Sequence, residues 1–180
     1  MIEYHKDLNL FFYELLQEAL KARKLNADPE VEHYLLALLG SVHTEAVTAT
    51  LVELQQKALQ QQEVSSYKSI GDCALTRIGI FEEYLTAKHI STSYIEMVGS
   101  QAYQTASNLA KRDKRAPIFY ELGSKFPTYA RVLDDIKEAT SLGCSDPLKL
   151  YEKYISKNST IALNKLNKLG LVVNTTESEA

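Results

Sequence analysis

Three glycines inside strongly apolar helical patterns constrain how this chain can fold. Gly71, Gly79 and Gly99 lie within residues 69–107, where apolar side chains recur every three or four positions. A glycine in a helix interior costs about 1 kcal/mol relative to alanine, so another gain must offset that cost. Small residues also surround these glycines, which allows two helix backbones to approach closely. We therefore expect a closely packed helix pair at the centre of the domain.

The rest of the sequence also predicts helices. Apolar spacings of three and four recur along it, and no alternating strand pattern or Asn-Gly hairpin turn is present. All four prolines stand at or near expected helix starts. Helices are expected at residues 8–24, 29–43, 44–61, 68–88, 92–111, 116–123 and 159–169, and two more start near residues 126 and 147, with apolar faces through residues 136 and 155. The helices at 29–43 and 44–61 could also be one longer helix with a bend near Gly40. The fold class is thus an all-α, single-domain helical bundle of eight or nine helices with a central buried helix pair, spanning residues 1–173. Residues 174–180 are expected to form a flexible C-terminal tail.

Composition and charge argue against several classes of partner. The net charge is −3, and the basic cluster at residues 111–115 is interrupted by Asp113, so no broad basic surface for nucleic acid is expected. The longest apolar run, residues 34–40, is too short to span a bilayer. The two cysteines, Cys73 and Cys144, are far apart, and no signal peptide is recognisable. We expect a cytoplasmic protein that does not insert into membranes.

No catalytic or metal-binding pattern stands out. Glu30 and His33 have the Glu-x-x-His spacing of di-iron bundles, but a second copy of that motif is missing. Cys73 lies among apolar residues, where a thiol behaves as a small hydrophobe with a raised pKa. No glycine-rich phosphate loop is present. The sequence therefore predicts no catalytic residue, no metal site and no cofactor, and it favours a non-enzymatic protein.

Four polar residues near the glycines are the candidate ligand-binding residues. The helix expected at 68–88 is apolar nearly all round, so Arg77 is a candidate for partial burial, with Glu96 and Asp72 as possible partners; a surface position for Arg77 is the alternative. Asp72 could also cap the helix or lie at the surface. Tyr103 and Glu96 share a small polar face of the helix at 92–111. Asp72, Arg77, Glu96 and Tyr103 would line any pocket between these two helices.

The sequence also resembles an uncharacterised family of bacterial all-helical proteins of about this length. The similarity covers most of the chain after residue 30 and rests on packing and turn residues: Gly71-Asp72, Gly79, Phe81, Leu85, Gly99, Ala102-Tyr103, Phe119, Glu121-Leu122, Phe126, Leu150-Tyr151-Glu152, Leu166 and Leu169-Gly170. The resemblance implies a bacterial, all-helical, cytoplasmic protein and assigns no activity to any residue.

Two functions are compatible with these observations. The first is a non-enzymatic cytoplasmic protein that acts through a protein partner or through self-association, in an adaptor or regulatory role, because amphipathic helices and eleven tyrosines suit protein interfaces. The second is a small-molecule binding protein or enzyme with a polar pocket between the helices at 68–88 and 92–111. The positions of Asp72, Arg77, Glu96 and Tyr103 are expected to distinguish them.

Overall fold

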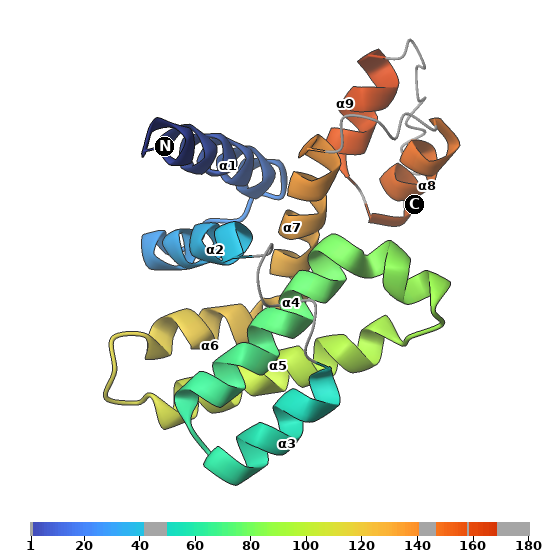
Figure 1. Cartoon of the computed structure of the whole chain (residues 1–180). Coiled ribbons are helices and arrows are strands. Elements are labelled where there is room, and N and C mark those ends of the chain that lie inside the picture. The colour runs from blue at the N-terminus through green and yellow to red at the C-terminus, as the bar shows by residue number, and fades with distance from the viewer. Residues whose placement is uncertain (1, 42–49, 141–146, 158, 169–180) are drawn as a thin grey trace, which may run out of the picture. The chain divides into compact units, whose positions relative to one another are not determined.

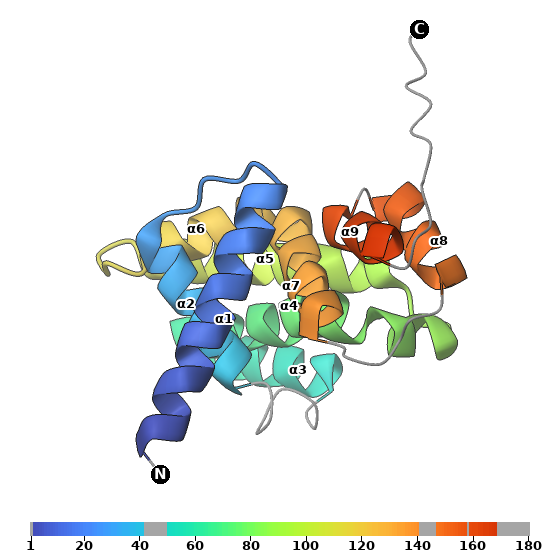
Figure 2. The ribbon, with the colours of Figure 1, turned by 90° about the horizontal axis from the view of Figure 1, so that it is seen from above.

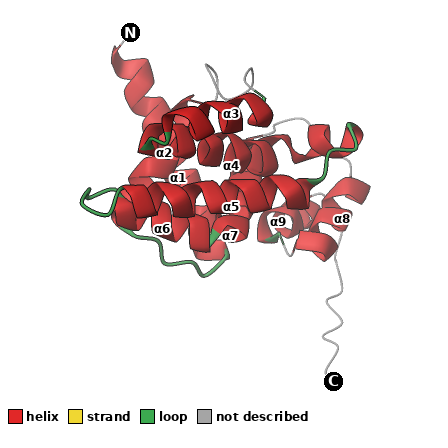
Figure 3. Cartoon of the chain, turned by 90° about the horizontal axis from the view of Figure 1, so that it is seen from below, coloured by secondary structure: helices red, strands yellow, loops and turns green. Residues whose placement is uncertain are grey.

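The computed structural model describes residues 2–41, 50–140, 147–157 and 159–168, and every regular element in these ranges is a helix (Figure 3). The helices are α1 (Ile2–Ala22), α2 (Pro29–Ser41), α3 (Leu51–Gln61), α4 (Val64–Ala87), α5 (Thr92–Leu109), α6 (Ala116–Ser124), α7 (Phe126–Thr140), α8 (Pro147–Lys157) and α9 (Thr160–Lys168). The all-α prediction is confirmed. Residues 174–180, predicted as a tail, lie outside the described residues.

Local sequence signals account for most of the helix starts. Asp28 accepts a hydrogen bond from the Glu30 backbone N–H at 2.9 Å, and Pro29 occupies the first position of α2. Thr50 and Glu53 form a reciprocal capping box at the start of α3. Two helices begin earlier than predicted, α1 at Ile2 rather than residue 8 and α4 at Val64 rather than residue 68. Asp72 therefore lies two turns inside the helix and is not an N-terminal cap.

The chain divides into two compact units, Met1–Ile136 and Lys137–Ala180, and the boundary falls within α7. In the second unit α8 packs on α9 around Leu150, Ala162 and Leu166. The first unit contains the candidate site and is described below by itself. The prediction of one domain over residues 1–173 stays a prediction.

In the first unit α4 and α5 run antiparallel through the centre (Figures 1 and 2). On their flanks α3 packs against α4 and α6 packs against α5, while α1 contacts α2 and α2 contacts α6. The core residues of this centre include Ala74 and Leu75 of α4 and Ile95, Tyr103 and Ala106 of α5. The predicted central helix pair is thus confirmed.

The glycines permit the close contacts within this centre. A β-carbon on Gly99 of α5 would lie 2.6 Å from the Ala74 β-carbon of α4 and 2.5 Å from Phe126 Cζ. A β-carbon on Gly71 would lie 2.6 Å from the Tyr103 ring. Gly79 faces α7 in the same way, with 2.5 Å to the Leu133 β-carbon. Because real β-carbons do not approach this closely, each glycine is required by its neighbour.

Buried polar contacts hold the chain around the α1–α2 connection against the centre. The Arg23 guanidinium donates two hydrogen bonds to the Asp135 carboxylate, at 2.7 and 2.9 Å, and Asp135 is 2% exposed. Glu121 of α6 accepts hydrogen bonds from Tyr129 at 2.6 Å and from Lys125 at 2.9 Å. Removing Arg23 would take the guanidinium partner from the buried Asp135 carboxylate, which is costly where water cannot replace it.

A pair of glycine-to-alanine variants tests whether Gly99 is required for close helix packing. Gly99→Ala is expected to lower the free energy of unfolding by about 1–3 kcal/mol, because the new methyl group must displace Ala74 or Phe126. Gly40→Ala in α2 has open space around the new methyl group and should raise stability by about 0.5–1 kcal/mol. Urea unfolding followed by circular dichroism measures both. Equal effects of the two variants would contradict the role assigned to Gly99.

Candidate functional site

The most concentrated polar group in the first unit is centred on Asp72 of α4. Its Oδ1 atom accepts hydrogen bonds from the hydroxyls of Tyr34 in α2 and Tyr103 in α5, the latter at 2.8 Å. Its Oδ2 atom accepts one from Lys68 Nζ at 2.6 Å, one helical turn earlier. Side chains from α2, α4 and α5 therefore meet at one carboxylate, which is 15% exposed.

Aromatic rings enclose this carboxylate on its inner side. The Tyr103 ring is stacked on Phe119 with 6.3 Å between centroids, and Tyr34 meets Phe119 edge-on at 6.0 Å. Lys68 Nζ also lies 5.2 Å from the centroid of the Tyr34 ring, within cation–π range. Burial raises the pKa of both tyrosine hydroxyls, and the negative charge of Asp72 raises the pKa further.

The raised pKa values of Tyr34 and Tyr103 determine what the polar group around Asp72 can do chemically. A phenol with a raised pKa stays protonated at neutral pH and donates a hydrogen bond rather than acting as a base or nucleophile. Asp72 already accepts from Tyr34, Tyr103 and Lys68. The arrangement is therefore suited to joining three helices through one carboxylate.

The structure joins two of the four predicted binding residues directly, because Tyr103 donates a hydrogen bond to Asp72. Arg77 and Glu96 are half-buried. The role of the four residues in ligand binding stays a prediction.

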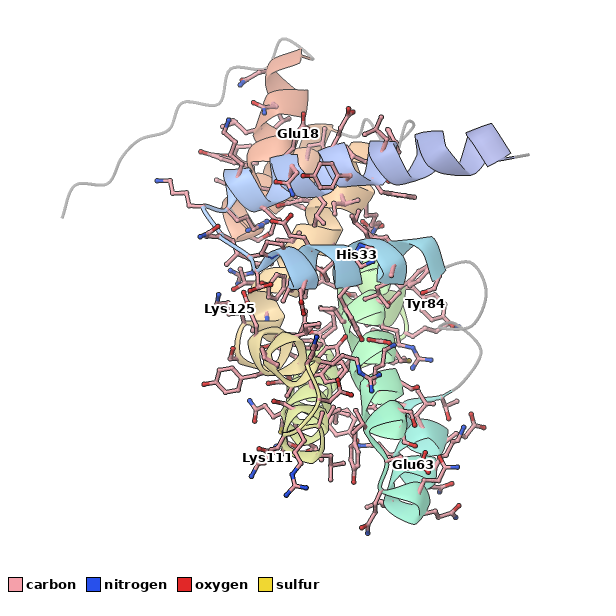
Figure 4. All side chains as sticks on the ribbon, turned by 90° about the vertical axis from the view of Figure 1, so that its left-hand side faces the viewer. Glu18, His33, Glu63, Tyr84, Lys111 and Lys125 are labelled. Carbon is pink, nitrogen blue, oxygen red and sulfur yellow. The ribbon has the colours of Figure 1, made fainter. Side chains whose placement is uncertain are left out.

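A cleft of about 200 Å³ lies on the other side of the same helix pair and is lined by residues of α3, α4 and α5. None of the four predicted residues lines it. Its lining residues are uncharged: Gln55, Ala58 and Leu59 of α3, Tyr67 and Ile70 of α4, and Val98, Gln101, Ala102 and Thr105 of α5. Glu63, which precedes α4, and Lys111, which follows α5, lie at the same end of the helix pair (Figure 4).

Sequence reasoning missed both Tyr34 and the cleft, for different reasons. The spacing of Lys68 and Asp72 at i and i+4 was readable as an ion pair, but the contact of Tyr34 with Asp72 spans 38 residues and carries no local signal. One face of α5 could have been predicted from the helical spacing of Val98, Gln101 and Thr105. The packing of α3, which completes the cleft, could not be predicted from residue spacing.

The structure also bears on metals and membranes. In the described part of the chain, no three His, Cys, Asp or Glu side chains gather in a geometry that could hold a metal ion. His33 is exposed on α2, and Glu18 lies on the neighbouring helix α1 (Figure 4). Cys73 is buried and its thiol pKa is raised by that burial, as predicted.

None of the described helices has both the length and the apolar composition needed to cross a bilayer.

Comparison with known proteins identifies no relative. Searches with this chain against protein-family models, curated proteins and solved structures give no match. The resemblance to a bacterial helical family stays a prediction.

Replacing Tyr103 by Phe tests the contribution of the Asp72 group to stability. Tyr103→Phe should lower the free energy of unfolding by about 1.5–3 kcal/mol, the usual range for a hydrogen bond to a charged group. Tyr120→Phe is the matched control, because Tyr120 is 66% exposed and should change stability by less than about 0.5 kcal/mol. Urea unfolding compares them. Similar stability of both variants would show that Tyr103 does not bind Asp72.

The raised pKa values predict alkaline destabilisation. In the unfolded chain Tyr34 and Tyr103 lose their protons near pH 10, whereas in the folded protein they keep them to higher pH. Their contribution to stability is complete below about pH 10 and decreases above it, by up to about 1.4 kcal/mol per pH unit for each tyrosine. Urea unfolding between about pH 9 and pH 11.5 should show this slope, and Tyr103→Phe should reduce it. An unchanged slope in that variant would contradict the assignment.

Proposed function

We propose that this chain is a non-enzymatic protein that binds a protein partner through the α3–α5 surface. This surface consists of the nine residues that line the cleft together with Tyr94, Met97 and Leu109 of α5. The observation that carries the proposal is that large exposed apolar side chains lie in or next to an uncharged cleft. Leu59, which lines the cleft, is 70% exposed. Tyr94, Met97 and Leu109 are each about half exposed, and each lies one helical turn along α5 from a lining residue. Aromatic residues and methionine are enriched at the centre of protein interfaces, and charged residues are depleted there.

The size and lining of the cleft favour a protein partner over a small molecule. Its volume of about 200 Å³ is below the range of about 300–1,000 Å³ that is usual for ligand pockets. A space of this size suits one or two apolar side chains from a partner. The lining has no charged group that could orient a polar ligand.

The polar groups outside the cleft also support a binding role rather than catalysis. Asp72 and Tyr103, the strongest candidates for chemistry, are hydrogen-bonded to each other. The cleft offers amides and hydroxyls but no carboxylate, imidazole or amine for acid–base chemistry. A cytoplasmic setting, and the bacterial origin that the resemblance implies, are part of this proposal.

Site-specific photo-crosslinking in cells that express the full chain tests the proposed surface. A benzophenone amino acid at Gln101, in the cleft, should give a discrete protein adduct. The same probe at Gln60 is the control, because Gln60 is exposed on the side of α3 away from the cleft. Leu59→Lys should lower the yield at position 101 more than about tenfold, since an unpaired charge would be buried in the interface. Absence of an adduct at position 101, or equal adducts at both positions, would reject the surface.

A further inference from the structure

A short, strongly positive turn connects α5 to α6. This basic turn, residues 111–115, consists of four cations and one carboxylate: Lys111, Arg112, Asp113, Lys114 and Arg115. All four cations are exposed. The connection projects outward at one end of the two helices (Figures 1 and 2). Because the whole chain has a net charge of −3 and this turn has +3, the rest of the chain carries −6.

The fold neutralises only one of these cations. The Asp113 carboxylate accepts hydrogen bonds from the Arg115 backbone N–H at 3.0 Å and from Arg115 Nε at 2.9 Å. In the described part of the chain, Lys111, Arg112 and Lys114 form no ion pair. Three positive charges therefore lie together in solvent, where an anionic partner can reach them.

Hydrogen bonds fix the backbone of the basic turn. The Asp113 N–H donates to the Ala110 carbonyl at 2.7 Å, and the Ala116 N–H donates to the Asp113 carbonyl at 3.1 Å. The contact of the Asp113 carboxylate with the Arg115 N–H closes the same turn. The cations are thus attached to an ordered backbone, so binding does not first require the turn to be ordered.

The stability of the neighbouring helices does not account for all four cations. Lys111 and Arg112 follow α5, where positive charge is favourable near the helix C-terminus. Lys114 and Arg115 instead precede α6, where the helix dipole disfavours positive charge. Arg115 occupies the N-cap position without a side-chain capping hydrogen bond, although short polar residues are preferred there. Residues that local folding disfavours point to a role in binding.

We infer that the basic turn binds an acidic segment of a protein partner. The positive charge is confined to this turn, because residues 97–110 and 116–120 on either side contain no charged side chain. A nucleic acid would need a longer basic surface that follows its phosphates. The charge of −6 on the rest of the chain would also repel an extended polyanion or an anionic membrane. A short segment with about three or four carboxylates fits a patch of this size.

This inference concerns a second surface and goes beyond the proposed function. None of the residues of the basic turn lines the cleft. The two surfaces also differ in chemistry, since the cleft is uncharged and the turn selects its partner by the sign of its charge.

Fluorescence anisotropy with the full chain tests the inference, with fluorescein-labelled hexaglutamate as the probe. The probe should bind at about 50 mM NaCl and more weakly at about 200 mM, because salt screens exposed charges. Lys111→Glu combined with Lys114→Glu should raise the Kd more than about tenfold. Lys21→Glu combined with Lys57→Glu gives the same net charge at exposed positions of α1 and α3, and should raise the Kd less than about threefold. Circular dichroism establishes that both double variants are folded.

A fluorescein-labelled thymidine hexanucleotide distinguishes carboxylates from phosphates as the bound groups. It should bind more weakly than hexaglutamate, and tighter binding would overturn the inference of a protein partner. Absence of hexaglutamate binding at about 50 mM NaCl, or an equal rise of the Kd in both double variants, would overturn the role of the turn. The cross-linking result at position 101 is independent of these outcomes, so failure of one proposal leaves the other standing.

Discussion

The close contact between α4 and α5 is the constraint on which the rest of the first unit depends. Ala74 and Gly99 meet without an intervening side chain, and the Tyr103 ring lies against Gly71. This position of the ring allows its hydroxyl to reach Asp72. A larger residue at Gly71 would displace Tyr103 and with it the hydrogen bond. Packing and polar contact are therefore coupled, since the same small residues make both possible.

Buried polar groups then fix how the other helices attach to this centre. The Asp72 carboxylate accepts a hydrogen bond from Tyr34 of α2, which attaches α2 to the central pair. The Asp135 carboxylate of α7 accepts one from Arg23, which follows α1. Buried ion pairs contribute little net stability, because desolvation offsets much of their attraction. A displaced helix would break these hydrogen bonds to a charged group, so the contacts favour the observed placement of α2 and of the chain that follows α1.

The sequence predicted the elements of this fold better than the contacts between them. Pro29 with Asp28 marked the start of α2, and Gly71 and Gly99 marked the faces of α4 and α5 that meet, because these signals are local. The contact of Tyr34 with Asp72 depends on how α2 is placed in the tertiary structure, which no spacing encodes. The cleft likewise depends on the packing of α3 against α4. Asp72 and Tyr103 were identified as polar residues of the centre, while their partners Tyr34 and Lys68 were not.

The outer face of α5 has a composition that folding does not require. Gln101 and Asn108 are exposed, so lysine or glutamate at these positions would cost little in packing. At position 108 either residue would also favour the helix, because asparagine is a weaker helix former. A helix selected only for stability and solubility would carry charges on such a face. The absence of charge from residues 97–110 therefore supports the proposal that this face, together with the adjoining cleft, binds a partner.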